Sequence, residues 1–297
     1  MKPPVFEYVV PESLDVALAV IAEHGGDARP LAGGQSLVPA MNFRVAQPAV
    51  LVDLNPLAEL DYVRQDDDGL RIGAMTRQRR VERDALVAER APLLHETMPH
   101  IAHPQIRNRG TIGGSLAHAD PAAELPVIAA ALDARIKARS ASGERSIPAA
   151  EFFQGIFTTA LNPDELLVEV AFPAMPPWAG SSFVEFARRH GDYALMGVAA
   201  VVAVDERGVC RQARLVYLNA GDGPVTAKQA AQLLLGHLPS PEAIEAAANM
   251  AADSEITPFG NVHATADYQR HLARVLTRRA LKQAFERAGE SIGLVVR

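Results

Sequence analysis

The chain of 297 residues contains a single cysteine, Cys210. One thiol cannot form an intramolecular disulfide. Nor can it supply the several cysteine ligands of an iron–sulfur cluster or a structural zinc site. Cys210 lies among apolar residues of a predicted strand, which is typical of a packed rather than a reactive cysteine. These classes of cysteine chemistry are therefore excluded within this chain.

The chain also lacks an excess of positive charge and a long apolar segment. Its formal net charge is −6, which argues against nucleic acid as a partner because phosphate binding needs a basic surface. The longest uncharged apolar run, residues 193–204, is far shorter than the roughly 20 residues of a membrane helix. With no signal peptide apparent at Met1, the sequence predicts a cytoplasmic protein without a membrane span.

Several common site motifs are absent as well. No G-x-G-x-x-G follows a strand and no G-x-x-x-x-G-K-[ST] occurs, which argues against a Rossmann site and a P-loop. Residues 34–38 begin like the G-x-S-x-G turn of serine hydrolases but lack its last glycine. A group of histidines lacks the H-E-x-x-H spacing of a zinc site, so we predict no metal site. These histidines are His95, His100, His103 and His118.

Two glycine-rich turns are the most informative segments present. The first spans residues 31–36 (LAGGQS) and the second residues 110–115 (GTIGGS). Glycine permits a positive φ and removes the Cβ that would block a ligand, and a row of N–H groups in such a turn binds anions. If the fold brings the two turns together, they can grip a diphosphate from both sides. The sequence therefore predicts a nucleotide-cofactor protein.

The first third of the chain alternates strand and helix signals. Strands are expected at residues 6–10, 30–32 and 50–54, with a helix capped by Ser13 and ended by Gly25. A short helix over residues 36–41 would place the N–H groups of residues 34–36 at its positive end. Residues 61–74 predict a hairpin that turns at residues 66–69, and Thr76 is expected to begin a helix.

The remaining pattern predicts two further blocks. A helix over residues 121–132, with Glu124 in its first turns, is followed by strands at 135–139, 146–147 and 166–172. Proline-rich residues 173–177 indicate a linker. Strands at 182–187, 199–204 and 209–217 then precede three helices, an order typical of an α+β domain. The last helix is expected to align Tyr268, Leu272, Val275, Leu276 and Leu281 on one stripe.

Four signatures together resemble one family. They are AGGQSLVP at 32–39, followed by Arg44 and VLVDLN at 50–55; RNRGTIGGS at 107–115 with HADPAAELP at 118–126; ARRHGDYA at 187–194; and ITP at 256–258 with HATADYQR at 263–270. The chain resembles the FAD-binding medium subunit of the molybdenum hydroxylases. This group includes aerobic carbon monoxide dehydrogenase and bacterial relatives of xanthine dehydrogenase. The resemblance covers residues 6 to about 285.

The resemblance implies an α+β fold with two domains. An FAD-binding domain of the PCMH type would cover residues 1–175, with subdomains at about 1–57 and 58–175. A C-terminal flavoprotein domain, a small antiparallel sheet with helices, would cover residues 178–288. This division agrees with the proline-rich linker.

The resemblance also implies an FAD site. Both glycine turns would hold the diphosphate through N–H groups and hydroxyls. Asp120 and Glu124 would face the ribityl and flavin side, with Tyr193 beside the isoalloxazine ring. Gln35 and Ser115 differ from some family members but keep hydrogen-bonding capacity. The expected FAD-binding residues are Ala32, Gly33, Gly34, Gln35, Ser36, Thr111, Ile112, Gly113, Gly114, Ser115, His118, Asp120, Glu124, Leu167, Arg188 and Tyr193.

The function implied is electron transfer within a complex. A large molybdenum subunit would oxidise the substrate, a small subunit would relay electrons through [2Fe–2S] clusters, and FAD on this chain would pass them to an external acceptor. The resemblance also implies a dimer of heterotrimers. It implies no catalytic residues in this chain, because the flavin carries the redox chemistry. Two alternatives remain open: a free-standing FAD-dependent oxidoreductase of the same fold, and a non-catalytic nucleotide-binding module. The substrate also remains open among carbon monoxide, an aldehyde and an N-heterocycle.

Overall fold

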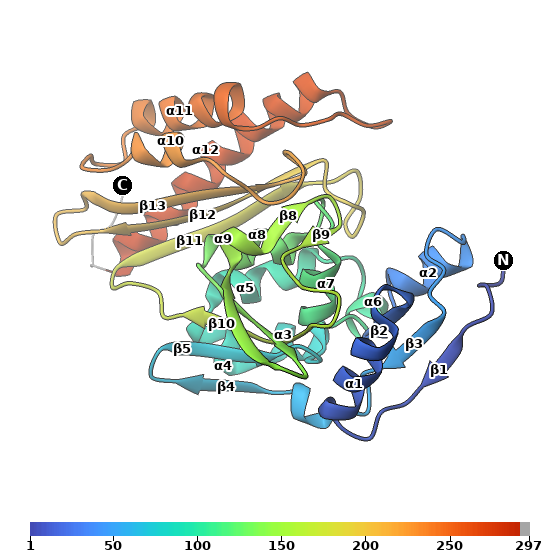
Figure 1. Ribbon diagram of the computed structural model, residues 1–297. Helices are drawn as coiled ribbons and strands as arrows, with labels where there is room; N and C mark the ends of the chain where they lie inside the picture. Colours follow the sequence, from blue (N-terminus) through green and yellow to red (C-terminus); the bar gives the residue numbers. More distant parts are fainter. Residues whose placement is uncertain (292–297) are drawn as a thin grey trace.

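The computed structural model describes residues 1–291. Three main β-sheets follow one another along the chain, each accompanied by helices (Figure 1). The first sheet has three parallel strands, the second has five antiparallel strands and the third has four antiparallel strands. Strands and helices are largely segregated in the last part, which confirms the predicted α+β class.

The N-terminal unit is a small parallel sheet with strand order β1-β3-β2. Its elements are β1 (Glu7–Val9), α1 (Leu14–His24), the 3₁₀ turn η1 (Gly25–Asp27), β2 (Ala28–Leu31), α2 (Leu37–Asn42) and β3 (Val50–Asp53). As predicted, Ser13 caps α1, accepting a hydrogen bond from the N–H of Val16. Because β2 and β3 run in parallel, their carboxyl ends place the first glycine turn beside Asn55.

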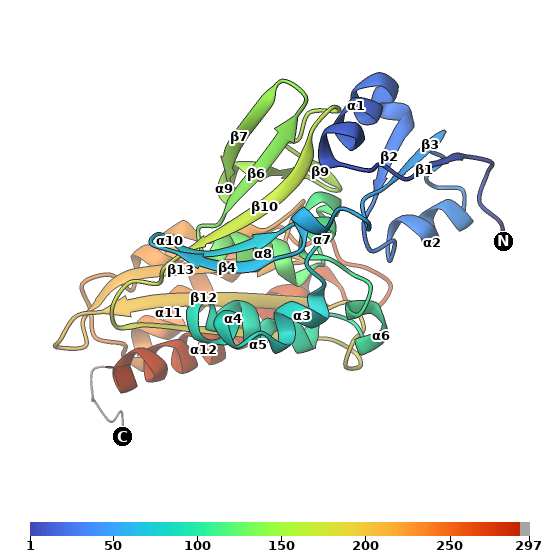
Figure 2. The same ribbon diagram turned by 90° about the horizontal axis from the view of Figure 1, so that it is seen from below.

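The middle unit is built on a five-stranded antiparallel sheet with strand order β4-β5-β10-β6-β7 (Figure 2). The strands are β4 (Val63–Asp66), β5 (Gly69–Gly73), β6 (Arg135–Ser140), β7 (Gly143–Pro148) and β10 (Leu166–Pro173), with a ribbon of β8 (Phe153–Gly155) and β9 (Thr158–Thr159). The helical segments are η2 (Ala58–Leu60), α3 (Gln78–Arg83), α4 (Ala85–Arg90), α5 (Pro92–Thr97), η3 (Met98–His100), α6 (Pro104–Arg107), α7 (Ile112–His118), α8 (Glu124–Ala131) and α9 (Ala149–Phe152).

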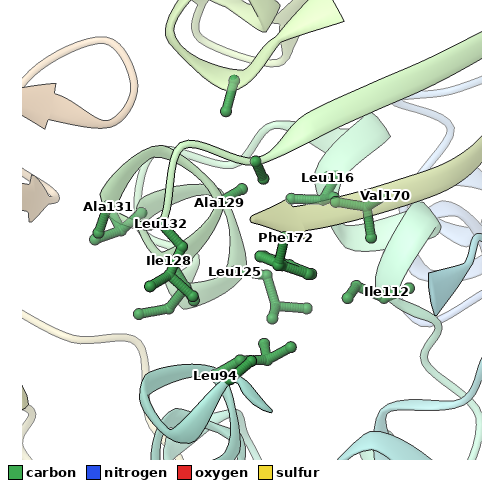
Figure 3. Close-up of a cluster of buried hydrophobic side chains, with 14 of the residues drawn as sticks. Leu94, Ile112, Leu116, Leu125, Ile128, Ala129, Ala131, Leu132, Val170 and Phe172 are labelled. Atoms are coloured by element: carbon green, nitrogen blue, oxygen red, sulfur yellow. The ribbon is translucent and has the colours of Figure 1, made fainter. Parts of the chain in front are cut away.

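A single hydrophobic core fixes α7 and α8 against this sheet. Leu125 and Ile128 of α8 point into the same cluster as Ile112 and Leu116 of α7 and Phe172 of β10 (Figure 3). Burial of such side chains contributes roughly 1.5–3 kcal/mol each. Both helices carry predicted site residues near their N-termini, so this core determines where those residues lie.

Two helix starts in the middle unit differ from the prediction. Thr76 does not begin α3, because its hydroxyl bonds both the carbonyl oxygen and the N–H of Tyr62, at 2.9 and 3.1 Å. The helix starts two residues later, at Gln78. Similarly, α8 starts at Glu124 rather than Pro121. The Asp120 carboxylate accepts a hydrogen bond from the N–H of Ala122 and holds residues 120–122 in a turn.

The C-terminal unit is an antiparallel sheet with strand order β11-β12-β13-β14. Its strands are β11 (Ala179–Phe186), β12 (Met196–Val204), β13 (Cys210–Leu218) and β14 (Val225–Thr226), followed by α10 (Lys228–Gln232), α11 (Pro241–Met250), a π-helical turn η4 (Ala251–Glu255) and α12 (Ala266–Ser291). Cys210 is fully buried, as predicted.

This sheet is covered on both faces (Figure 1). Alternate residues of a strand point to opposite faces: Val216 and Leu218 pack into the middle unit's core, whereas Leu215 and Tyr217 pack under α12. The approach of α12 is close, since a Cβ on Gly180 of β11 would lie 2.0 Å from the carbonyl oxygen of Ala284. The middle and C-terminal units therefore share a packed boundary.

The buried stripe of α12 differs from the prediction at its first turn. Leu272, Leu276 and Leu281 are buried as expected, and Val275 is half-buried. Tyr268 is exposed, and the next residue, Gln269, is 1% exposed in its place. Within residues 1–291, no helix combines the length and the apolar character that crossing a bilayer requires.

Candidate functional site

The first glycine turn, residues 32–36, presents a row of unused backbone donors. It connects β2 to α2, and Gly34 has a φ of +72°, which side chains rarely tolerate. Within residues 1–291, none of the N–H groups from Ala32 to Ser36 donates a hydrogen bond to the protein. Consecutive free N–H groups around a residue with positive φ form an anion-binding concavity.

The two glycine turns are in contact, which is the condition that the diphosphate hypothesis set. A Cβ placed on Gly33 would lie 2.4 Å from the carbonyl oxygen of Arg109 and 2.7 Å from Cα of Gly110. A Cβ on Gly114 would lie 3.4 Å from that of Ala32. Gly33 is therefore required for the approach of the two backbones, because any side chain would force them apart.

The second glycine turn differs from the expectation in its hydrogen bonds. The N–H groups of Ile112 and Gly113 donate to the carbonyl oxygens of Thr76 and Ala74, at 3.1 and 2.9 Å. The N–H of Gly114 donates to the hydroxyl of Thr111, which caps α7, at 3.0 Å. These donors hold α7 against the middle sheet and are not free for a ligand. Free N–H groups were expected of both turns, but in the second turn only the N–H of Thr111 lacks an acceptor within residues 1–291.

Asn55 and Arg77 connect the two turns from behind. The side-chain amide of Asn55 donates to the carbonyl oxygen of Ala32 at 3.1 Å. The guanidinium of Arg77 donates to both Asn55 and the carbonyl oxygen of Arg109. Burial, and then the neighbouring Arg109, lower the pKa of Arg77. Arg77 therefore places positive charge at the contact of the two turns, with the carboxylates of Asp53 and Asp61 also near it.

A second group of predicted residues gathers at the boundary with the C-terminal unit. Asp120 lies just before α8, and Glu124 is the first residue of that helix. Tyr193 lies in the loop between β11 and β12. Partial desolvation, then the charges of Asp120 and Glu124, raise the pKa of the Tyr193 phenol. The ring of Tyr193 is nevertheless 71% exposed. The structure therefore brings these three residues together and leaves one aromatic face open.

Beneath this group lies a buried acidic cluster that the sequence did not indicate. Burial, then the charge of Glu185, raise the pKa of Glu124 to about 7. Glu185 of β11 lies 3.2 Å from His100, measured from its Oε1 to Nδ1, and its carboxylate raises the pKa of His100. The second carboxylate oxygen of Glu185 is buried without a partner within the described chain.

The remaining predicted residues have more scattered positions. His118, at the end of α7, lies against Phe157 with ring centroids 4.9 Å apart. Arg188 lies 3.0 Å from the ring nitrogens of His263, linking two of the sequence signatures. Leu167 is buried in the hydrophobic core. Over residues 1–291, no group of three or more His, Cys, Asp or Glu side chains could hold a metal ion.

Sequence reasoning missed several residues of this region. Asn55 and Gln269 occur inside the quoted signatures but received no role. Arg77, His100 and Glu185 carry no local signal, because their contacts join segments far apart in the chain. Arg77 could be identified only after the contact between the two glycine turns was known, because it binds at that contact.

Two family models match consecutive parts of the chain. The FAD binding domain in molybdopterin dehydrogenase matches residues 4–175. The CO dehydrogenase flavoprotein C-terminal domain matches residues 181–284. Together they cover nearly the same span as the resemblance noted from the signatures.

Curated proteins and solved structures of related dehydrogenases and oxidoreductases match nearly the whole chain. The chain is 45% identical to the 6-hydroxypseudooxynicotine dehydrogenase complex subunit alpha of Paenarthrobacter nicotinovorans, over 97% of both chains. It is 37% identical to the carbon monoxide dehydrogenase medium chain of Hydrogenophaga pseudoflava, over 97% of this chain and 99% of the relative. A structure of carbon monoxide dehydrogenase from that organism superposes with a TM-score of 0.94 at 37% identity, covering 97% and 99% of the two chains. Quinoline 2-oxidoreductase from Pseudomonas putida 86 gives a TM-score of 0.92 at 38% identity and the same coverage.

The raised pKa of Glu124 has a testable consequence for stability. A carboxyl whose pKa is about 7 in the folded protein but near 4.3 when unfolded favours folding while it is protonated. Its contribution is complete at low pH and is lost as the pH rises through 7. Glu124→Gln should therefore gain stability relative to the parent between pH 5 and pH 8, by about 2–3 kcal/mol.

Urea unfolding of both proteins across this pH range measures the difference. Glu151→Gln, at an exposed glutamate of α9, is the control and should show no such trend. A stability difference between Glu124→Gln and the parent that stays constant from pH 5 to pH 8 would contradict the assignment.

Proposed function

The chain belongs to the family of FAD-binding subunits of molybdenum hydroxylases, and from this we propose that it transfers electrons from a [2Fe–2S] partner to an external acceptor. The observation that carries the proposal is the row of free N–H groups in the first glycine turn, at its contact with the second. This feature suits the diphosphate of FAD. FAD-binding proteins of this family are subunits of oxidoreductases, so the chain is an oxidoreductase subunit.

The residues present fit FAD at the diphosphate end. Free N–H groups from Gly33 to Ser36 offer donors to the phosphate oxygens, and Arg77 and Arg109 supply positive charge. The missing side chain of Gly33 allows the second turn to approach, and Gly34 permits the positive φ of the first turn. The N-terminus of α7, with the hydroxyl of Thr111 nearby, faces the same region from the second turn. In this assignment the second turn contributes mainly by position, because its N–H groups from Ile112 to Ser115 are paired.

At the other end, Asp120, Glu124 and Tyr193 are assigned to the flavin side. Asp120 is placed to accept hydrogen bonds from ribityl hydroxyls, and the exposed ring of Tyr193 offers an apolar face to the isoalloxazine. Bound FAD supplies the redox centre, which can take up two electrons and release them to an acceptor. The protein then supplies binding, orientation and exclusion of water.

The partners follow from what this chain cannot supply. Two electrons from an oxidised substrate must arrive through another redox group, and a single buried cysteine cannot ligate an iron–sulfur cluster. We therefore assign the clusters to a small [2Fe–2S] subunit and substrate oxidation to a large molybdenum subunit, in a cytoplasmic dimer of heterotrimers. Two of the similar proteins described above are themselves subunits, an alpha subunit and a medium chain of dehydrogenases.

The surface near Tyr193 supports a partner at this end. Phe259 and Val262 are large apolar residues, 64% and 93% exposed. Both precede His263 in the same loop, and His263 contacts Arg188 in the signature that contains Tyr193. Exposed apolar groups of this kind are typical of surfaces that another subunit covers.

We place the FAD-binding domain at residues 1–175 and the C-terminal domain at 178–288.

The role of the first glycine turn can be tested with a matched pair of substitutions. Gly34→Val introduces a side chain where φ is +72°, and its Cβ would lie 3.2 Å from Val38 and 3.3 Å from Leu31. Gly236→Val is the control, because Gly236 has a φ of +79° but no atom within 4 Å of its Cβ position. Gly113→Val is a poorer probe, since its Cβ would lie 2.6 Å from that of Ala74.

We expect Gly34→Val to purify folded but with little FAD, because a distorted turn no longer aims its N–H groups at the diphosphate. Gly236→Val should carry the FAD content of the parent despite a similar backbone strain. Flavin absorbance per protein measures both. A Gly34→Val protein with full flavin occupancy would show that the diphosphate lies elsewhere.

The electron-transfer role is tested by mixing the subunits. The purified chain should show FAD absorption bands that a substrate bleaches only after the molybdenum and [2Fe–2S] subunits are added. N-heterocycles, aldehydes and carbon monoxide are the substrates to try. Bleaching by substrate with this chain alone would instead indicate a free-standing flavoenzyme. Purification without any flavin, and failure to take up added FAD, would indicate a nucleotide-binding module of another kind.

A further inference from the structure

We propose that Gln269 and Asn219 act as positioning residues that fix the Tyr193 loop, residues 187–195, and so orient the flavin end of the site. We call this pair the amide clamp. The proposal rests on the proposed function, because it takes Tyr193 and Asp120 to face the isoalloxazine and ribityl groups. It also gives a role to the signature at residues 256–270, which the assignment of FAD contacts leaves without one.

Asn219 connects the Tyr193 loop to the turn that holds Asp120. Its side-chain amide donates to the carbonyl oxygens of Ala194 and Leu195, at 2.9 and 3.2 Å. These are the two residues that follow Tyr193. Its backbone N–H donates to the carbonyl oxygen of Pro121 at 2.8 Å. Asn219 has a φ of +54°, a conformation that asparagine tolerates better than most residues.

Gln269 holds the same loop from the other side. Its amide nitrogen donates to the carbonyl oxygen of Leu195 at 3.0 Å and lies 3.4 Å from that of Asn219. Its amide oxygen accepts from the N–H of Gly260 at 2.9 Å. Gln269 is 1% exposed, and burial strengthens hydrogen bonds while making unpaired groups costly. This geometry leaves its amide little freedom to turn.

The position of Gln269 on α12 argues against simple core filling. It begins the buried stripe that continues with Leu272 and Leu276, where an apolar side chain of similar size would serve packing alone. The bonds it makes instead join three loops from different parts of the chain. One of the three is the Tyr193 loop itself, and the other two border that loop or the Asp120 turn.

Apart from the amide clamp and the contact of Arg188 with His263, the Tyr193 loop has few restraints on its path. Inside it, the N–H of Asp192 bonds the carbonyl oxygen of Arg189 at 3.1 Å, and that of Leu195 bonds Phe186 at 2.8 Å. At Gly191, φ is +86° and a Cβ would lie 2.3 Å from the ring of His103. The His103 ring therefore locates the middle of the loop, and the amide clamp locates its end. The exposed ring of Tyr193 lies between these two points.

The test compares binding of FAD with binding of ADP, which carries a diphosphate but no flavin. In Gln269→Leu, loss of the clamp should lower FAD affinity about tenfold, or about 1.4 kcal/mol, and change the visible circular dichroism of the bound flavin. ADP affinity should stay within twofold of the parent, because the first glycine turn is untouched. Gln269→Glu keeps an acceptor for Gly260 but loses the donor to Leu195, and should behave like the leucine variant.

Thr277→Val is the matched control on the same helix. Thr277 is fully buried and bonds the hydroxyl of Tyr217 and the carbonyl oxygen of Ala273, at 2.7 and 2.6 Å, away from the Tyr193 loop. Its substitution should lower the melting temperature but leave both affinities and the flavin spectrum unchanged. Asn219→Gly, which keeps the positive φ and removes the amide, provides a second test of the clamp if Gln269→Leu does not fold.

The outcomes separate the clamp from the proposed function. A parent protein that binds ADP but not FAD, or neither, contradicts the proposed function itself. A parent that binds both, with Gln269→Leu and Asn219→Gly unchanged in FAD affinity and spectrum, overturns the clamp alone. Equal losses of FAD and ADP affinity in those variants would also overturn it, because they would show a general loss of structure.

Discussion

Gly33 allows the backbones of residues 32–36 and 109–110 to approach more closely than any side chain would permit. This contact joins the edge of a parallel sheet to the start of a helix on an antiparallel one. Asn55 and Arg77 hold the contact from behind through carbonyl oxygens, so the N–H side of the first turn stays unpaired. The anion-binding geometry depends on this arrangement, since free donors in a flexible turn would otherwise find partners within the protein.

The two ends of the proposed site are built on different physical principles. The diphosphate end consists of backbone, and its geometry is set by positive φ angles and by the absence of side chains. The flavin end consists of side chains from two units, Asp120 and Glu124 from one and Tyr193 from the other. Its geometry therefore depends on how those units pack, through the shared core around α8 and the hydrogen bonds of Asn219 and Gln269. Redox chemistry needs both ends of the site, because tight binding of the diphosphate does not by itself orient the flavin ring.

Local signals in the sequence predicted much of the fold. The Ser13 cap, the hairpin turn at residues 66–69 and the succession of the last strands each depend on neighbours in sequence, and each was confirmed. The contact between the two glycine turns was a condition of the diphosphate hypothesis, and the structure meets this condition. Errors arose where a distant residue competes for a local group. Thr76 bonds Tyr62 instead of capping a helix, and the donors of the second turn bond Ala74 and Thr76. The burial of Gln269 in place of Tyr268 likewise depends on loops far away in the chain.

The central claim is that the free N–H groups of the first glycine turn hold the diphosphate of FAD. Amide hydrogen exchange of residues 33–36, measured with and without bound FAD, tests it most directly. The account predicts rapid exchange in the FAD-free protein, because these groups have no acceptor within the described chain, and strong protection once FAD is bound. The paired N–H groups of Ile112 and Gly113 should be protected in both states. Saturation with FAD while residues 33–36 continue to exchange rapidly would contradict the account.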